Sequence, residues 1–219
     1  MIVTPGARAI LAAAALLLLA SCGRAGGTMA PLPPPSGWKE GILEYRAAKD
    51  RDFRTDPDTP LLAKDVPTFS GLEYWPPDPV YRFAGSIEID GAPRRFTIVT
   101  TTGKERPCER YGQVAFEVRG KRCVLQVYRL LDTDPEPGGA GFFVPFQDET
   151  TGKETYPAGR YVELDGPAGG PYVLDFNRAI NPSCAYGDPQ RFRCPVTPAE
   201  NRLTVRIEAG ERGYVSHGR

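Results

Sequence analysis

The sequence predicts a mainly β protein of the α+β class: an antiparallel β-sandwich or barrel with one N-terminal helix and long Pro/Gly-rich loops. After residue 80, apolar and polar residues alternate in several short segments, which is the period of a half-buried strand. No amphipathic helices separate these segments, and this argues against a parallel sheet. The 24 glycines and 23 prolines favour many turns, while an aromatic content of 10% is too high for a disordered chain.

The N-terminal segment resembles a secretory signal that ends in a lipid-attachment site. Arg8 is followed by an apolar run over 9–20 that is too short to span a bilayer. Leu19-Ala20-Ser21-Cys22 then resembles the bacterial lipobox, in which the cysteine thiol is acylated and the chain is cut in front of it. The resemblance implies a signal peptide over 1–21. The alternative is a plain signal peptide, or a membrane stub, with a chance cysteine.

This resemblance also implies a place in the cell envelope, lipid-anchored on the extracytoplasmic or periplasmic face. Gly23, rather than an aspartate, follows the cysteine, so the outer membrane is the expected destination if the host has one. We expect a flexible tether over 22–37, where small residues and prolines gather. A single β-rich domain over 38–211 and a tail over 212–219 follow.

The elements of the domain are expected in the following order. Ser36 is a candidate N-cap for a helix over about 38–54, whose apolar stripe is expected to pack on the core. The prolines between Asp56 and Pro79 forbid long regular structure, so a wrapping loop follows. A short helical turn is expected at 197–200. Strands are expected over 81–89, 96–100, 114–118, 123–131, 141–147, 159–164, 172–177 and 202–208.

The cysteines predict disulfides. Lipidation of Cys22 leaves an even four, and outside the cytoplasm four thiols are expected to pair. Cys184 and Cys194 enclose a short loop whose glycine and proline let the chain turn back, so we favour this bridge among the three connectivities. Cys108 and Cys123 are then the remaining pair.

Several function classes lack their sequence patterns. There is no C-x-x-C, and the only histidine, His217, lies in the tail, so the competing interpretation of the cysteines as a zinc site fails on spacing. No G-x-S-x-G, Walker or H-E-x-x-H motif occurs. The 27 basic and 27 acidic residues balance, which does not favour nucleic acid. We therefore expect no metal, no cofactor and no nucleic acid. The expected partners are a membrane, through the lipid, and an envelope protein or a small anionic ligand.

The second half carries a set of short motifs: Pro145-Phe146, Gly159-Arg160-Tyr161, Asp175-Phe176-Asn177, Asn181-Pro182, Cys184-Ala185-Tyr186, Cys194-Pro195 and Glu200-Asn201. This set resembles the bacterial family catalogued as domain of unknown function 1684. The resemblance extends forward to 45–50 and 71–78 and so covers most of the chain from about 38 to 211. Thr197 and Ile180 depart from the pattern, and the Cys108/Cys123 pair is not part of it. The resemblance implies a lipoprotein-type member of that family but no activity.

Polar side chains of this half are candidates for a ligand site at one end of the sheet. They are Asp148, Lys153, Tyr156, Arg160, Asp175, Asn177, Arg178, Glu200 and Asn201. An arginine beside a carboxylate can hold an anionic group through two hydrogen bonds. The alternative is structural: Arg160 pairs with Asp175 or Glu200 inside the fold, and the asparagines satisfy backbone groups.

Two functions from different classes follow from these residues. The first is a lipid-anchored binding or assembly module without catalytic residues. The second is an envelope hydrolase with Asp175 or Glu200 as general base and Arg160 as anion clamp. The burial and pairing of Arg160 distinguish them, because a clamp needs an accessible guanidinium.

Replacing Cys22 by serine removes the acyl acceptor and tests the lipid anchor. We expect the C22S protein to be released in soluble form or to accumulate as an uncleaved precursor, because acyl chains provide the stable membrane attachment. Intact-mass analysis of the wild type should show a chain that begins at Cys22 and carries a diacylglycerol. An unmodified N-terminus elsewhere would contradict the prediction.

Overall fold

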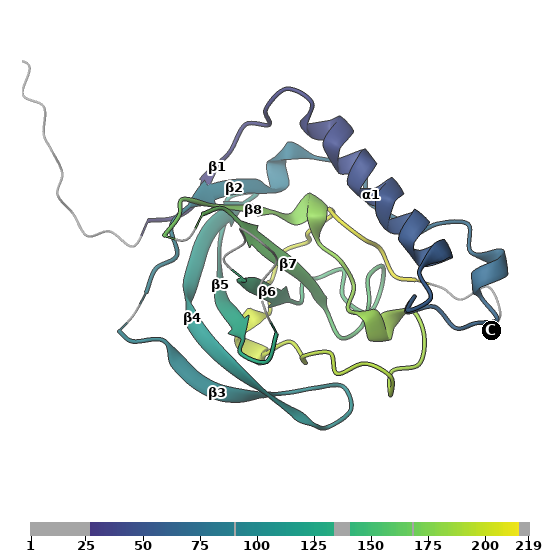
Figure 1. Ribbon diagram of the computed structural model, residues 1–219. Coiled ribbons are helices and arrows are strands. Elements are labelled where there is room, and N and C mark those ends of the chain that lie inside the picture. Colours follow the sequence, from purple (N-terminus) through teal and green to yellow (C-terminus); the bar gives the residue numbers. More distant parts are fainter. Residues whose placement is uncertain (1–26, 90, 134–140, 168, 215–219) are drawn as a thin grey trace, which may run out of the picture.

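The protein contains one curled antiparallel sheet. The computed structural model describes residues 27–89, 91–133, 141–167 and 169–214 (Figure 1). The eight strands lie in the order β1-β2-β8-β7-β6-β5-β4-β3. Their bounds are β1 Ala30–Pro31, β2 Arg82–Gly85, β3 Arg94–Val99, β4 Glu105–Val118, β5 Lys121–Leu130, β6 Phe143–Phe146, β7 Arg160–Asp165 and β8 Tyr172–Asp175. The predicted mainly β class is confirmed, but the strands form one open sheet and not a closed barrel.

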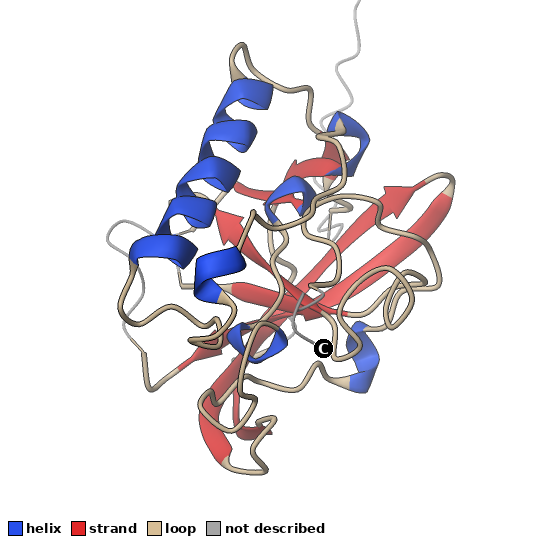
Figure 2. Ribbon diagram, turned by 90° about the vertical axis from the view of Figure 1, so that its right-hand side faces the viewer, coloured by secondary structure: helices blue, strands red, loops and turns tan. Residues whose placement is uncertain are grey.

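Helices are few in the described residues. The single α-helix, α1 (Trp38–Thr55), confirms the expected N-terminal helix. It lies on the opposite side of the molecule from the β3–β4 hairpin (Figure 1). Loops and 3-10 helices cover one side of the sheet, where the second sheet of a sandwich would lie (Figure 2). The 3-10 helices are η1 Val66–Thr68, η2 Pro79–Tyr81, η3 Phe176–Arg178, η4 Ser183–Ala185 and η5 Ala199–Asn201.

The long strand β4 brings the two ends of the sheet toward each other. Its pairing with β5 shifts register between Arg110 and Gly112, and such a bulge bends a strand. There, Glu88 and Gln113 exchange backbone hydrogen bonds of 2.8 and 2.9 Å. A Cβ at Gly112 would lie 2.4 Å from the oxygen of Glu88, so only glycine permits this approach. The segment after β2 therefore rests against β4, at the far end of the strand order.

Aromatic side chains fill the main core on one face of the sheet. Phe176 contacts Phe116 and Phe146 with ring centroids 5.4 and 5.1 Å apart, and Phe83 lies 5.0 Å from Phe116. All four are fully buried, and burying such a side chain contributes about 1.5–3 kcal/mol. These rings come from β2, β4, β6 and η3, so the core joins segments far apart in the sequence.

Helix α1 is held by a buried arginine as well as by apolar packing. Ile42 and Phe53 are buried, as the apolar stripe predicted. Between them Arg46 donates to the backbone oxygens of Trp75 and Asn177 at 2.8 and 3.1 Å. The predicted N-cap was wrong. The N-cap residue is Gly37, with φ of 77°, which glycine adopts without strain, and no side chain caps the helix there.

Residues 202–208 do not form the predicted strand. Leu203, Val205 and Ile207 are buried, as their alternation predicted. Their backbone groups, however, bond to the loop after β6 and to buried side chains instead of a neighbouring strand. The N–H of Leu203 donates to the oxygen of Gln147 at 2.8 Å, and the N–H of Ile207 donates to the carboxylate of Asp148 at 2.7 Å. An alternation of apolar and polar residues predicts which side chains are buried, but it does not predict which groups form hydrogen bonds with the backbone.

The folded domain extends past both predicted limits. Met29 is 1% exposed and donates its N–H to the oxygen of Ala115 at 2.6 Å, so β1 lies inside the segment expected to be a tether. At the other end Tyr214 packs against Phe69 and Tyr186. The predicted signal and Cys22 lie outside the described residues. Among the described residues, no helix combines the length and apolar character needed to cross a bilayer.

One buried asparagine joins strands β5 and β6 where the two strands form few backbone hydrogen bonds with each other. The two strands pair only at Tyr128 and Phe143. Beside this pair, the Asn201 amide accepts from the N–H of Gln126 at 2.7 Å and donates to the oxygens of Gln126 and Pro145 at 2.9 and 2.7 Å. Its side chain thus replaces backbone hydrogen bonds that the strands do not make to each other.

We expect Asn201→Ala to destabilise the fold by at least about 2 kcal/mol, because several buried backbone groups lose their partners. Chemical unfolding measures the change. Arg202→Ala is the matched control, since that exposed neighbour bonds only to the side chain of Gln147 and should change stability by less than about 0.5 kcal/mol. Equal stabilities of the two variants would contradict the prediction.

Candidate functional site

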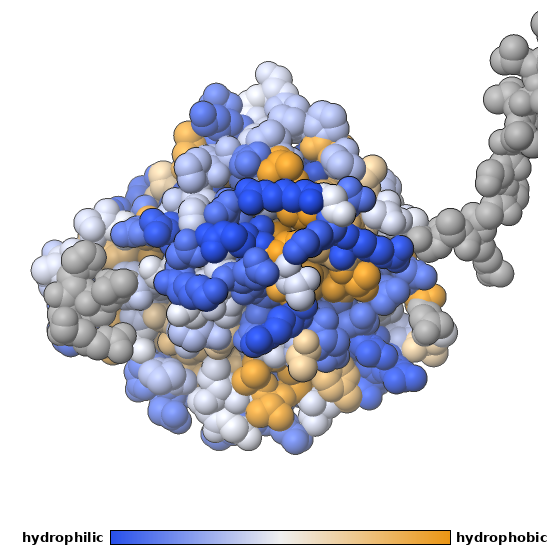
Figure 3. Space-filling view, turned by 180° about the vertical axis from the view of Figure 1, so that it is seen from behind, coloured by the Kyte–Doolittle hydropathy of each residue, from blue (hydrophilic) through white to orange (hydrophobic). Residues whose placement is uncertain are grey.

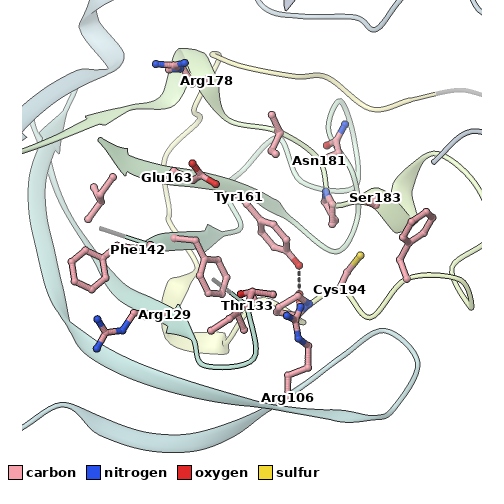
Figure 4. A pocket seen from close by; sticks show the side chains of 18 of the residues that line it. Arg106, Arg129, Thr133, Phe142, Tyr161, Glu163, Arg178, Asn181, Ser183 and Cys194 are labelled. Carbon is pink, nitrogen blue, oxygen red and sulfur yellow. Dashed lines mark hydrogen bonds between the residues drawn. The ribbon is translucent and has the colours of Figure 1, made fainter. Parts of the chain in front are cut away.

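A pocket of about 930 Å³ lies on the face of the sheet opposite the main core (Figure 4). Its floor is formed by β6 and β7, and two irregular segments, 178–183 and 192–195, form its walls. The end of the β4–β5 hairpin and Tyr45 of α1 complete the rim. Its volume lies within the range of small-molecule sites, roughly 300–1,000 Å³.

Tyr161 of β7 positions both walls of the pocket. Along β7, Arg160, Val162 and Leu164 are buried toward the core, so Tyr161 points to the other face, as alternation requires. Its backbone exchanges two hydrogen bonds of 2.8 Å with Ile180. Its hydroxyl donates to the backbone oxygen of Pro195, the bond drawn in Figure 4. One residue therefore ties segments 178–183 and 192–195 to the sheet.

Arginines outnumber carboxylates in the pocket lining. The lining arginines are Arg106, Arg129, Arg178 and Arg193, and the lining carboxylates are Glu163 and Asp165. Three of the arginines already pair: Arg106 with Asp132 at 2.7 Å, Arg129 with Glu109 at 2.5 Å and Arg178 with Asp165 at 3.3 Å. The hydrogen bonds from Arg106 lower the pKa of Asp132, which keeps that carboxylate charged.

Arg193 is the lining arginine that makes no ion pair in the described part of the chain. It donates from Nη2 to the backbone oxygen of Glu105 at 2.9 Å, and no carboxylate of the described residues lies within ion-pairing distance. Arg106 lies next to it and donates from Nη1 to its backbone oxygen at 3.4 Å. The two cations therefore form the positive end of the pocket, beside Cys194.

Aromatic rings and an unpaired acceptor complete the lining. The rings are Tyr45, Phe142, Phe143, Tyr161 and Phe192. Asn181, 2% exposed, donates its amide N–H to the oxygen of Arg212 at 2.8 Å, but its Oδ1 atom has no partner in the described structure. A buried acceptor without a donor is costly, so a ligand N–H or O–H, or a water, at this wall would satisfy it.

The predicted site residues do not converge on this pocket. Of the nine, only Arg178 lines it. Lys153 lines a separate cavity of about 320 Å³, beside Glu154 and Arg212. Asn201 joins β5 to β6, and Glu200 accepts a hydrogen bond of 2.9 Å from the hydroxyl of Tyr128. Tyr156 donates to the sulfur of Cys184.

Arg160 is a structural residue. It is 1% exposed, and its guanidinium donates to the backbone oxygens of Ala209, Glu211 and Ile207. Its charged partner is Asp148 at 3.6 Å, and not Asp175 or Glu200 as expected. Burial lowers the pKa of Arg160 to about 10, opposed first by the charge of Asp148, so the guanidinium stays protonated at neutral pH.

Asp175 is also committed to structure. Its carboxylate accepts from the indole of Trp38 at 2.8 Å and from the backbone and side-chain N–H groups of Asn177 at 3.0 and 2.8 Å. Arg82 lies 3.4 Å away. Asn177 in turn bonds both backbone groups of Asp78 at 2.8 Å. These contacts join the start of α1, η2 and η3 and leave no free carboxylate oxygen for a substrate.

The aromatic residues near the N-terminus also serve packing. Tyr81 and Phe83 lie in the main core. Tyr74 stacks under the guanidinium of Arg46 at 4.5 Å. On the back of the molecule, hydrophilic side chains predominate and apolar residues show in separate areas between them (Figure 3). A broad apolar docking surface is therefore not present on that face.

The structure separates one predicted cysteine pair and brings the other pair together. All four described cysteines are free thiols. Cys108 lies opposite Leu130 in the β4–β5 ladder and Cys123 lies opposite Phe116, so the two cysteines are at different ends of the hairpin. Seven residues of strand separate Leu130 from Cys123, roughly 23 Å, which excludes a Cys108–Cys123 bridge. Cys184 and Cys194 are in contact: the N–H of Cys184 donates to the sulfur of Cys194 at 3.4 Å.

Sequence reasoning missed most of the pocket arginines. Arg106, Arg129 and Arg193 stand outside the short motifs of the second half. Arg106 and Arg193 are 87 residues apart in the sequence. The one available signal was on β7, where Tyr161, Glu163 and Asp165 share the parity opposite the buried residues. Only the sheet register shows that this face meets segment 192–195.

Comparisons with known proteins show what the chain is similar to. A family model described as "Protein of unknown function (DUF1684)" matches residues 67–212. The solution NMR structure of an uncharacterized protein from Haloarcula marismortui is similar in fold, with a TM-score of 0.62 and 32% sequence identity. The alignment covers 82% of this chain and 96% of that chain. No curated protein matches the sequence.

The structural role of Arg160 predicts a large loss of stability in Arg160→Ala. Breaking a buried ion pair typically costs about 3–5 kcal/mol, because Asp148 stays buried without its partner. Thermal and chemical unfolding measure the loss. Arg122→Ala, at an exposed position of β5, is the control and should unfold like the wild type. A wild-type melting temperature for Arg160→Ala would overturn the structural assignment.

Proposed function

This chain belongs to the DUF1684 family of proteins of unknown function, and we propose that it is a lipid-anchored binding module of the cell envelope. Its ligand is a small anion with an apolar or aromatic part, held in the pocket between β6–β7 and segments 178–183 and 192–195. The observation that carries the proposal is the pocket lining, in which four arginines and five aromatic rings surround about 930 Å³.

The lipid anchor rests on the signal and lipobox pattern that ends at Cys22. Because Met29 is already buried in the domain, only residues 23–28 would join the lipidated cysteine to it. An extended chain of that length spans at most roughly 25 Å. The domain would therefore sit close to the membrane, with its β1–β2 edge nearest the lipid.

The pocket suits an anionic ligand for electrostatic reasons. Arg193 keeps donors available, and the planar guanidinium matches a carboxylate or phosphate through two parallel hydrogen bonds. Phe143 and Phe192 offer apolar surface in the same lining. The unpaired oxygen of Asn181 adds an acceptor for a donor on the ligand.

Binding is favoured over hydrolysis by the positions of the residues that hydrolysis would need. Arg160, Asp175 and Glu200 lie in three separate clusters, and none of them lines the pocket. A general base must reach the proton that it removes, and an anion clamp must reach the substrate. Arg160 therefore cannot act as the anion clamp that the hydrolase hypothesis requires.

Arg193→Gln tests the ligand site directly. Anilinonaphthalene sulfonate, an aromatic anion, is the probe, and its fluorescence on titration gives the Kd. We expect binding to weaken about tenfold, which corresponds to about 1.4 kcal/mol, because one charge-assisted contact is lost. Binding to the wild type should also weaken as salt is added.

Arg202→Gln is the matched control, since this exposed arginine lies outside the pocket and should keep the wild-type Kd. Both variants should melt like the wild type. Equal probe affinities for the wild type and Arg193→Gln, with no dependence on salt, would overturn the proposed anion site.

A further inference from the structure

Two thiols meet at the wall of the pocket. Cys184 and Cys194 are 4% and 8% exposed, and the N–H of Cys184 donates to the sulfur of Cys194 at 3.4 Å. Cys194 also lines the pocket (Figure 4). The two cysteines are therefore in contact, and the pair borders the pocket through Cys194.

The surroundings of Cys184 favour its thiolate. The interaction with the Cys194 side chain and the hydrogen bond from the hydroxyl of Tyr156 lower the pKa of Cys184 to about 6, against the effect of burial. The Tyr156 hydroxyl lies 3.8 Å from this sulfur. Burial raises the pKa of Tyr156 to about 12, so the hydroxyl stays protonated and remains a donor.

The loop that carries the two cysteines is held without a disulfide. Asn181 and Tyr186 donate to the buried carboxylate of Glu211 from a backbone N–H and a hydroxyl. Farther along, Gly187 lies so close to the oxygen of Pro60 that a Cβ there would be 2.2 Å from it. These contacts come from outside the loop, so the fold accommodates the reduced pair.

We propose that Cys184 and Cys194 are a reversible dithiol–disulfide couple that exchanges with a small anionic disulfide entering through the pocket. A thiolate held by several donors stabilises the reduced state, so the disulfide is easier to reduce than a purely structural one. The cations near Cys194 favour an anionic reagent. Arg193 is the residue before Cys194, and Arg106 lies beside it and donates to its backbone oxygen. This selection rests on the proposed anion site, whereas the couple itself does not.

The exchange proceeds in two steps. The Cys184 thiolate attacks one sulfur of the small disulfide, which forms a mixed disulfide on Cys184 and releases one thiolate. The released thiolate then takes the proton of the Cys194 thiol, and the Cys194 sulfur attacks the sulfur of Cys184, which closes the Cys184–Cys194 bond and releases the second thiolate. The protein pair is oxidised by two electrons, and the small disulfide is reduced to a thiol and a thiolate.

The test uses the mature chain in buffers of oxidised and reduced glutathione. We expect intact mass to fall by two hydrogens in oxidised buffer, with Cys184 and Cys194 joined in the digest, and to return in reduced buffer. Cys194→Ser should stop at the first step and carry one glutathione on Cys184. Cys123→Ser is the control and should still close the bridge, because Cys123 lies in the main core.

Tyr156→Phe tests the donor to Cys184. This variant should fold normally but react several-fold more slowly with an alkylating reagent at neutral pH, because the thiolate has lost a donor. Unchanged reactivity would overturn the role of Tyr156 in the couple. Failure of the wild type to close the bridge, or a bridge that reduced glutathione cannot reopen, would overturn the couple itself.

A neutral reagent separates this inference from the proposed function. Hydroxyethyl disulfide should oxidise the pair more slowly than oxidised glutathione, and Arg193→Gln should remove the difference. Equal rates with both reagents in the wild type would overturn the selection of an anionic disulfide and leave the redox couple supported. Closure with neither reagent would reject the couple, whatever the probe titration of the anion site shows.

Discussion

The buried guanidinium of Arg160 is the interaction on which the rest of the structure depends. Its Nη atoms donate to three backbone oxygens of the C-terminal segment, those of Ile207, Ala209 and Glu211. That segment forms no strand, so its carbonyls have no ladder to satisfy them, and unpaired buried carbonyls are costly. Asp148 supplies the compensating charge and accepts a hydrogen bond from the N–H of Ile207. The Arg160–Asp148 pair therefore satisfies both carbonyl and N–H groups of the C-terminal segment.

The pocket is a consequence of this anchoring. Once the C-terminal segment is fixed, the carboxylate of Glu211 reaches Lys49 of α1 at 2.5 Å and the N–H of Asn181 at 2.8 Å. Asn181 stands in one wall of the pocket, and the neighbouring Ile180 is tied to Tyr161 of β7. A cavity built on such contacts keeps its shape without a ligand, and preformed sites bind at lower entropic cost.

Charged residues divide into two groups by burial. Arg46, Arg160 and Asp175 are buried, and each of them forms hydrogen bonds with backbone groups. Arg193 is exposed at the pocket and keeps donors in reserve. The first group holds loops that regular secondary structure does not hold, and the second is available to a ligand. In this chain, the most prominent polar motifs of the second half therefore serve the fold.

The amino-acid sequence by itself determined the β-rich class, the helix over 38–54, most strands and the family, because alternation, turn residues and short motifs are local properties. It also determined that Leu203, Val205 and Ile207 are buried. The tertiary structure decided that this segment is not a strand, that Cys108 and Cys123 are far apart and that Arg160 pairs with Asp148. These outcomes depend on sheet order and register, which bring together residues remote in the chain. A local sequence pattern does not encode which remote residues become neighbours in space.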